Sequence, residues 1–371
     1  MKKYPYVNLS KQHRSYRQIF SKKLIEVMNK GNFILGENVQ RFESDFKKYV
    51  GTKYAVGVGS GTDALFLTLK YLNLKPDDEV ITVSNSYLST VSTIYLAGAK
   101  AKLVDVNYDD YQISLDKIKE KVNKKTKAIV VVHLCGIPCD INKILKFANK
   151  KKITVIEDCA QAIGASINKK KVGSFAFSGC FSLHPLKNLN AMGDGGIITT
   201  NKKKFYEWLI RARNNGHSSR DDCAFWSHNM RLDELQSIFL NVKLKKYNQV
   251  IKKRNNNVKL YKKILKNLVE YPVVKINNLA VYQTFIIKIK NKKRDMLQKF
   301  LLGKGFETKI HYPKPVHKMN VYLRNYKKIN LPITEKLSKE ILTLPAMEYI
   351  DREHIVKLSN YIKIFLKKFN K

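Results

Sequence analysis

The stretch Gly57-Val58-Gly59-Ser60-Gly61-Thr62-Asp63-Ala64-Leu65 joins a short apolar run to a segment with helical spacing. Small residues at such a junction let backbone N–H groups approach an anion, and the start of a helix adds favourable partial charge. The stretch lacks the lysine of nucleoside-triphosphate loops. It therefore indicates either a phosphate-binding turn or a tight turn with Thr62 or Asp63 in the first helical turn. In both cases a strand leads directly into a helix, as in α/β proteins.

Outward from this junction, β-rich runs alternate with helical stretches as far as about residue 200. The expected strands cover residues 54–58, 79–83, 102–106, 128–133 and 154–158, and helices are expected over 62–72 and 141–149. This alternation predicts an α/β fold whose mostly parallel central sheet is covered by helices on both faces.

The two ends of the chain have patterns of their own. Residues 1–30 predict an N-terminal arm with a basic helix, and residues 205–270 are largely helical. Near Tyr271 a second pattern begins, with strands expected over 282–288 and 307–311 and a helix over 294–302. We therefore expect an N-terminal arm and large domain over 1–249 and a smaller C-terminal α/β domain over 250–371, in agreement with the roughly 150 residues of an average domain.

The charge balance is strongly basic, with 70 Lys and Arg residues against 30 Asp and Glu residues and a formal net charge of +40. A basic surface can bind nucleic acid or acidic membranes. Here the lysines are spread along the whole chain without an Arg-rich stripe or aromatic interleaving. We therefore expect neither a nucleic-acid nor a membrane partner, although a basic surface would attract an anionic substrate. The charge-free run over residues 80–99 carries eight Ser, Thr or Asn residues and is too polar to span a bilayer.

The cysteines are sparse, odd in number and form no C-x-x-C pair; they are Cys135, Cys139, Cys159, Cys180 and Cys223. This usage is typical of reduced thiols in a cytoplasmic protein, and the N-terminus lacks the apolar stretch of a signal peptide. No second Cys/His pair stands at ligand spacing, so we expect no metal site.

Two further segments carry candidate chemistry. Val155-Ile156-Glu157-Asp158 ends an expected strand with carboxylates, at the edge of a parallel sheet where ligands bind, although an Asp there can also cap a helix. Lys187 follows 29 residues later, between an apolar strand and Gly193-Asp194-Gly195-Gly196. A partly desolvated lysine can form a Schiff base with an aldehyde. A phosphate cradle, a carboxylate for a pyridine nitrogen and an amine for an aldehyde together indicate a pyridoxal phosphate site.

With these residues the sequence resembles the DegT/DnrJ/EryC1/StrS sugar aminotransferases, which have the type I, aspartate aminotransferase-like fold. The shared motifs run through nearly the whole chain: residues 31–36, 60–65, 133–140, 157–162 and 182–196, then Asn229 to Gln236 and Ile310 to Pro313. Two positions differ from the pattern of the family. Many relatives have His at the position of Ile163, and an aromatic residue is common at the position of Cys135.

The resemblance implies specific roles. Lys187 would form the Schiff base, Asp158 would pair with the pyridine nitrogen and Gln161 would bond the ring hydroxyl. The remaining cofactor contacts would come from Gly61, Thr62 and Ser182 at the phosphate, from Tyr87 on the ring face, and from Asn229 of the neighbouring subunit. The last contact implies a homodimer with shared active sites. For the substrate, the resemblance points to His311, Tyr312, His317 and Arg231, each of which could instead have a structural role.

The implied activity is transfer of an amino group from L-glutamate to a keto sugar, with a nucleotide-linked 3-keto-6-deoxyhexose favoured by the motif context around Lys187. Such enzymes serve amino-sugar biosynthesis. A 4-keto nucleotide sugar or an inosose is an alternative acceptor. The sequence is also compatible with a sugar dehydratase, which in relatives has His in place of the lysine, and with a non-catalytic regulatory or polyanion-binding protein.

Overall fold

A seven-stranded sheet forms the centre of the molecule in the computed structural model, which describes residues 3–291 and 293–369. Its strands, in spatial order, are β1 (Tyr54–Val58), β9 (Gly196–Thr200), β8 (Ser178–Ser182), β5 (Thr154–Asp158), β4 (Thr126–Val132), β2 (Glu79–Val83) and β3 (Lys100–Val104). Strand β9 runs in the direction opposite to the other six strands of this sheet. The prediction of a mostly parallel α/β sheet is confirmed.

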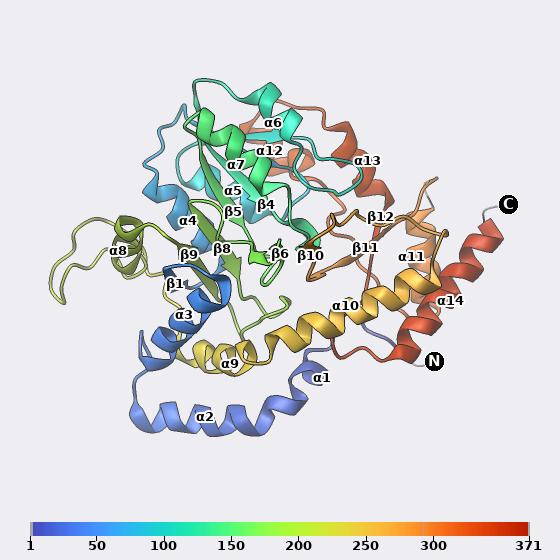
Figure 1. The fold of residues 1–371 in the computed structure, drawn as a ribbon, viewed down its shortest axis with the longest axis horizontal. Helices are drawn as coiled ribbons and strands as arrows, with labels where there is room; N and C mark the ends of the chain where they lie inside the picture. The colour runs from blue at the N-terminus through green and yellow to red at the C-terminus, as the bar shows by residue number, and fades with distance from the viewer. Residues whose placement is uncertain (1–2, 292, 370–371) are drawn as a thin grey trace.

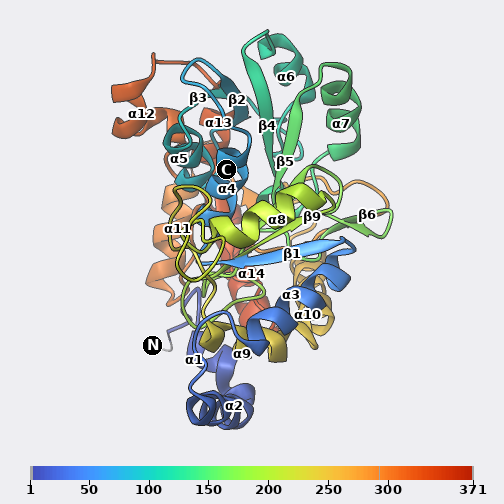
Figure 2. The ribbon, with the colours of Figure 1, turned by 90° about the vertical axis from the view of Figure 1, so that its left-hand side faces the viewer.

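Helices cover both faces of this sheet (Figures 1 and 2). One face packs against α4 (Gly61–Tyr71), α5 (Leu88–Leu96) and α8 (Lys203–Ala212). The other face packs against α3 (Glu37–Val50), α6 (Leu115–Lys121), α7 (Ile141–Lys150) and α9 (Glu234–Leu244). Neighbouring strand residues such as Val80 and Ile81 lie in different core clusters, because side chains alternate across a sheet.

The C-terminal part is built on a two-stranded antiparallel sheet of β11 (Phe285–Lys288) and β12 (Ile341–Leu344). Its helices are α10 (Tyr247–Ile264), α11 (Arg294–Gly303), α12 (Asn320–Asn325), α13 (Pro332–Glu340) and α14 (Arg352–Phe369). Short elements complete the fold: the strands β6 (Ser166–Ile167), β7 (Lys170–Lys171) and β10 (Asn278–Leu279), and the 3-10 turns η2 (Leu134–Gly136) and η3 (Val316–Lys318). The expected domain boundary at 249/250 falls inside helix α10. Because one continuous helix crosses that position, the structure does not mark a break there, and the boundary stays a prediction.

The strand expected over 307–311 is not formed. Its Lys309 makes a single bridge to Thr343, while the backbone N–H of Glu307 donates to the carbonyl oxygen of Tyr4. Tyr4 also stacks on Phe306, with ring centroids 4.4 Å apart. The N-terminal arm thus takes the hydrogen bonds that a longer ladder would have used.

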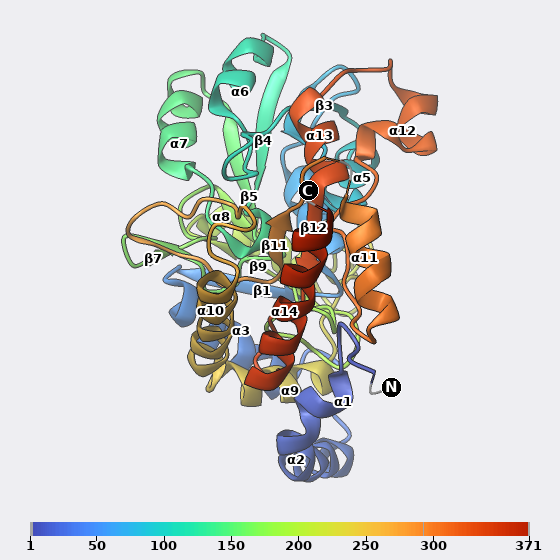
Figure 3. The same ribbon diagram turned by 90° about the vertical axis from the view of Figure 1, so that its right-hand side faces the viewer.

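The arm consists of α1 (Leu9–His13), η1 (Arg14–Tyr16) and α2 (Arg17–Lys30). Phe20 and Val27 of α2 pack on Ile238 and Phe239 of α9. In Figures 1 and 3 the arm lies along the end of the molecule at which α9 is found. Across the described ranges, no helix combines the length and apolar character needed to cross a membrane.

Candidate active site

Most of the expected site residues converge at the carboxyl ends of the parallel strands, where ligands bind in open α/β sheets. Asp158 ends β5, Ser182 ends β8, and the Gly-rich junction lies between β1 and α4. They line a cavity of about 520 Å³, which is within the range for small-molecule sites. The lining includes these expected residues: Gly61, Thr62, Tyr87, Asp158, Gln161, Ser182, Lys187, His311 and Tyr312.

Asp158 is 3% exposed, and both of its carboxylate oxygens have donors. Thr90 Oγ1 donates to Oδ2 at 2.8 Å, and the backbone N–H of Ala160 donates to Oδ1 at 3.1 Å. Burial raises the pKa of Asp158, while these donors and the nearby Lys187 oppose the rise. The carboxylate is therefore held in one orientation, facing the cavity.

Lys187 lies on the loop after β8, and its side chain lines the same cavity. Burial lowers its pKa, and the charge of Asp158 opposes the shift. Its Nζ makes no hydrogen bond or ion pair within residues 3–291 and 293–369. An unpaired, desolvated amine that shares a cavity with a carboxylate is suited to bonding with an aldehyde.

The Gly-rich junction forms a cradle beside Ser182. Ser60 caps α4, since its Oγ accepts from the N–H of Asp63 at 3.0 Å. The N–H groups of Gly61 and Thr62 precede this bond, in the first turn, where helices lack internal acceptors. A Cβ on Gly61 would lie 2.6 Å from the Cβ of Ser182, so only glycine lets the strand end and the helix start approach so closely. The geometry of the junction thus suits an anion, in line with the phosphate-binding interpretation of its sequence.

The lining of the cavity also contains an amide and two aromatic residues. Gln161 Oε1 accepts from the backbone N–H of Cys135 at 2.8 Å, and Gln161 Nε2 donates to Tyr312 Oη at 3.0 Å. Tyr87 is 62% exposed and its ring centroid lies 6.3 Å from that of Tyr312. His311 also lines the cavity, and burial together with Lys187 and Lys309 lowers its pKa to about 4. Its imidazole is therefore neutral near neutral pH.

Three expected residues lie outside the cavity. His317 is fully buried, with Nδ1 2.6 Å from Ser84 Oγ and Nε2 3.1 Å from Glu335 Oε1, so it joins α13 to the end of β2. Arg231 donates to Asn214 Oδ1 at 3.1 Å. Asn229 is exposed on the segment between α8 and α9. Within a single chain, none of the three reaches the candidate site.

The cavity has further lining residues that the sequence did not assign to the cofactor. Ser89 and Thr90 of α5 line the cavity, as do His184, Asp194, Gln283 and Thr284. Ser89 Oγ lies 2.8 Å from Thr62 Oγ1, so α5 touches both the phosphate cradle and the carboxylate. The sequence did contain a signal for Ser89 and Thr90, because the run over 80–99 is unusually rich in Ser, Thr and Asn. We used that polarity only to exclude a membrane span.

Beneath Asp158 lies a buried group of His133, Glu157 and Cys159, whose potential ligand atoms all lie within 4.8 Å of one another. Glu157 accepts backbone N–H groups from Gly173, Phe175 and Ala176, and also lies 3.1 Å from His133 Nε2. Because the carboxylate is occupied by these donors, we interpret the group as a structural support for β5.

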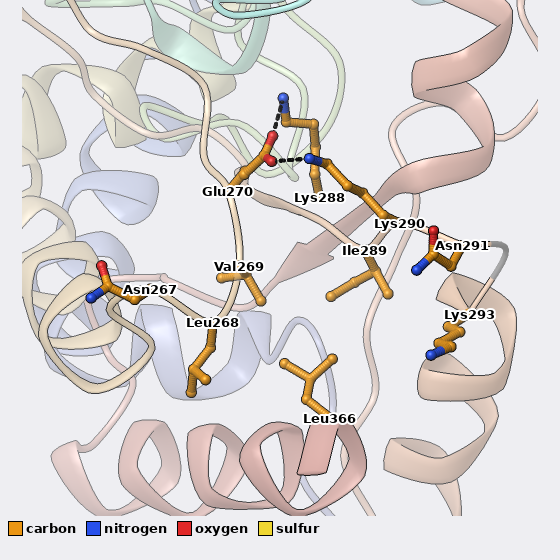
Figure 4. A pocket seen from close by; sticks show the side chains of 10 residues that line it. All are labelled: Asn267, Leu268, Val269, Glu270, Lys288, Ile289, Lys290, Asn291, Lys293 and Leu366. Carbon is orange, nitrogen blue, oxygen red and sulfur yellow. Dashed lines mark ion pairs between the residues drawn. The ribbon is translucent and has the colours of Figure 1, made fainter. Parts of the chain in front are cut away.

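A second cavity of about 520 Å³ lies next to β11 and α14 (Figure 4). Its Glu270 pairs with Lys288 at 2.7 Å and also with Lys290. Because its carboxylate is already paired with two lysines, this cavity differs from the one that Lys187 and Asp158 line, where the amine is unpaired within the described part of the chain.

The fold and the cavity around Lys187 are those expected of an enzyme that holds an aldehyde cofactor on a lysine. Comparison with known sequences gives the particular group: the chain belongs to the DegT/DnrJ/EryC1/StrS aminotransferase family, whose profile matches residues 15–363. Members of this family are pyridoxal phosphate-dependent. The protein is an aminotransferase, and the resemblance inferred from its motifs is confirmed.

Three similar proteins agree with this assignment. The dTDP-3-amino-3,6-dideoxy-alpha-D-galactopyranose transaminase of Aneurinibacillus thermoaerophilus is 37% identical over 355 residues, which cover 95% of this chain and 97% of the relative. The structure of S. venezuelae DesV in complex with a ketimine intermediate is 28% identical, with a TM-score of 0.95 and 99% of each chain covered. Bacillus subtilis NtdA with bound cofactor PMP is 26% identical, with a TM-score of 0.93, covering 99% of this chain and 86% of NtdA.

Proposed function

We propose that the protein uses pyridoxal phosphate to move the amino group of L-glutamate onto a nucleotide-linked 3-keto-6-deoxyhexose. The observation that carries the proposal is that the amine of Lys187, unpaired within the described ranges, and the buried carboxylate of Asp158 line one cavity, where the charge of Asp158 acts on the pKa of Lys187. The identity with the dTDP-3-amino-3,6-dideoxy-alpha-D-galactopyranose transaminase supports the choice of sugar.

The residues present fit the cofactor. The cradle of Gly61, Thr62 and Ser182 would hold the phosphate, Asp158 would keep a ring nitrogen protonated, and the exposed Tyr87 would cover the ring. Gln161 has a second N–H for the ring hydroxyl, beyond the one given to Tyr312. When bound, pyridoxal phosphate supplies an aldehyde that bonds to amines and a ring that accepts an electron pair.

Lys187 is placed to move the proton that amino transfer requires. Its Nζ has no partner among the described residues and burial lowers its pKa, so the amine can accept a proton from a substrate carbon and return it. The same lysine favours amino transfer over dehydration, which relatives achieve with a histidine.

The acceptor would contact the wall formed by His311 and Tyr312, the two expected substrate residues that line the cavity. The formal charge of +40 would attract the diphosphate of a nucleotide sugar. A 4-keto sugar or an inosose remains an alternative acceptor.

A homodimer would complete the site. Asn229 is exposed, and large apolar side chains are exposed near it and at the cavity, including Trp226 at 100% and Leu186 at 51%. Apolar groups so exposed are typical of surfaces that pack against another chain.

We further propose that residues 250–371 form the smaller domain. We also propose that the enzyme works in the cytoplasm, because its free cysteines are typical of a reducing compartment.

The test compares Lys187→Ala with Lys204→Ala, a control at an exposed position of α8. With added pyridoxal phosphate, the wild type and Lys204→Ala should be yellow, and their visible band should shift on adding L-glutamate. Lys187→Ala should form no product above background. A panel of 3-keto and 4-keto nucleotide sugars then identifies the acceptor. Product formation by Lys187→Ala at the wild-type rate would contradict the proposal.

A further inference from the structure

The loop that carries Lys187 is short and tightly held. The N–H of Lys187 donates to the carbonyl oxygen of His184 at 2.8 Å, and the N–H of Ala191 closes the loop on Leu183 at 2.8 Å. On one side Gln283 Nε2 donates to the carbonyl oxygen of Leu186 at 2.7 Å. The position of the reactive amine therefore depends on what holds the carbonyl groups of this loop.

Asn190 holds the loop from the other side. This residue is 1% exposed, and its Nδ2 donates to the carbonyl oxygen of Pro185, two residues before Lys187. The same Nδ2 donates to Gln12 Oε1 at 3.1 Å. Both amide hydrogens of Asn190 are thus used to tie the Lys187 loop to helix α1 of the N-terminal arm.

Lys243 of α9 supplies the donors for the oxygens of Asn190. Its Nζ lies 2.7 Å from the carbonyl oxygen of Asn190, 2.7 Å from Asn190 Oδ1 and 2.7 Å from His13 Nε2. Lys243 is 6% exposed, and burial lowers its pKa to about 7 while Glu348 opposes the shift. Because Lys243 does not line the cavity around Lys187, its role is not that of a second catalytic lysine.

The contacts continue into the C-terminal part of the chain. Gln12 Nε2 donates to Glu348 Oε1 at 2.7 Å, and Glu348 Oε2 accepts from Arg254 Nε at 3.0 Å. Figures 1 and 3 show α1 close to α9 at one end of the molecule. Asn190 and Lys243 thus connect the Lys187 loop to α9, to the arm and, through Gln12, to the loop before α14.

We propose that Asn190 and Lys243 are positioning residues, which hold the Lys187 loop in the geometry that its amine needs in order to react. The inference rests on the proposed function, since it concerns the reactivity of the amine assigned there. A misplacement of a reacting group by about 1 Å can slow a reaction by roughly 100-fold. Loss of either residue should therefore slow the reactions of Lys187 far more than an exposed substitution does.

The experiment measures how fast cofactor-free protein captures added pyridoxal phosphate, followed by visible absorbance well below the melting temperature. Borohydride reduction and peptide mass spectrometry then confirm the attachment at Lys187. The variants are Lys243→Met and Asn190→Ala, and the control is Lys245→Met, an exposed lysine two residues further along. We expect capture to slow by roughly 10- to 100-fold in the two test variants and to stay within about twofold of wild type in the control. Because both residues act in one cluster, the double variant should be little slower than either single variant.

The outcomes separate the inference from the proposed function. If wild type does not capture the cofactor at Lys187, the proposed function fails. If wild type captures it and both test variants keep the wild-type rate, even with lowered melting temperatures, the residues are only structural and the inference is wrong. Should Lys243→Met fail to fold, Asn190→Ala decides alone, because that variant keeps the backbone carbonyl that Lys243 binds.

Discussion

Replacing Thr90 by Val tests how the carboxylate of Asp158 is kept ionised. Thr90 Oγ1 donates to Asp158 Oδ2 at 2.8 Å, and both residues are buried. Valine has nearly the shape of threonine but cannot donate. After the substitution, Oδ2 loses this donor while Oδ1 keeps the backbone N–H of Ala160.

The sign and size of the effect follow from this geometry. Burial already raises the pKa of Asp158, and the Thr90 hydrogen bond is the first of the contacts that oppose the rise. A hydrogen bond to a charged group contributes about 1.5–3 kcal/mol, which corresponds to roughly 10- to 100-fold in a protonation equilibrium. Without this bond, Asp158 stays protonated to higher pH. The acid limb of the pH–rate profile should therefore move to higher pH.

The assay is kcat/KM for amino transfer as a function of pH, together with a pH titration of the visible band. Thr93→Val is the matched control, because Thr93 is also buried in α5 but its Oγ1 donates to the carbonyl oxygen of Ser89. We expect Thr93→Val to keep the wild-type acid limb. If the acid limb of Thr90→Val coincides with that of Thr93→Val, the hydrogen bond does not control the charge of Asp158.

Three more substitutions test other parts of the structure. Gly61→Ala places a Cβ 2.6 Å from that of Ser182, and overpacking of about 1–3 kcal/mol should weaken pyridoxal phosphate binding in a spectroscopic titration by roughly 10- to 100-fold. His311→Gln should raise KM for the keto sugar while the pH–rate profile above about pH 6 keeps its shape, because the imidazole, whose pKa is about 4, is already neutral there. Arg213→Met breaks a buried pair with Glu43 and should lower the free energy of unfolding by about 3–5 kcal/mol in urea titrations.

Each of these predictions has its own control or contrary result. Gly303→Ala meets open space and should bind the cofactor normally, so equal losses in both Gly variants would count against the cradle. For His311, a wild-type limb near pH 7 that disappears in the variant would show that the imidazole titrates there. Lys203→Met removes an exposed pair with Glu207 and should change the free energy of unfolding by less than about 1 kcal/mol.

The ends of a strand could be predicted from the sequence where they coincide with the ends of an apolar run. Strands β1, β2 and β5 begin and end at the residues expected from their apolar runs. The pattern predicts β3 over 102–106, but the strand covers Lys100–Val104, because its partner β2 ends at Val83, opposite Val104. The backbone of residues 105–107 then bonds to residues 112–114 instead, and local periodicity does not reveal this change of partner.

The site was predictable to the extent that topology decides it. In a parallel sheet, strand ends followed by helices meet at one edge, so Gly61, Asp158 and Lys187 could be expected together before any contact was known. The family resemblance assigned them roles, and the structure places all three on one cavity. The surroundings of His317 could not be predicted, since its partners Ser84 and Glu335 come from two different segments of the chain.

The residues that tune such a site are harder to predict than the residues that form it, and the reason is physical. A reacting amine or carboxylate must be of one chemical type, so the sequence displays it. A hydrogen-bond donor that orients it can be a threonine, an amide or a lysine from any element that happens to be adjacent. Thr90 and Lys243 illustrate this: Thr90 donates to Asp158 and Lys243 donates to Asn190 of the Lys187 loop, each across a gap of dozens of positions, and both residue types are common in helices. Only the folded chain brings Thr90 of α5 to the end of β5, and Lys243 of α9 to the Lys187 loop.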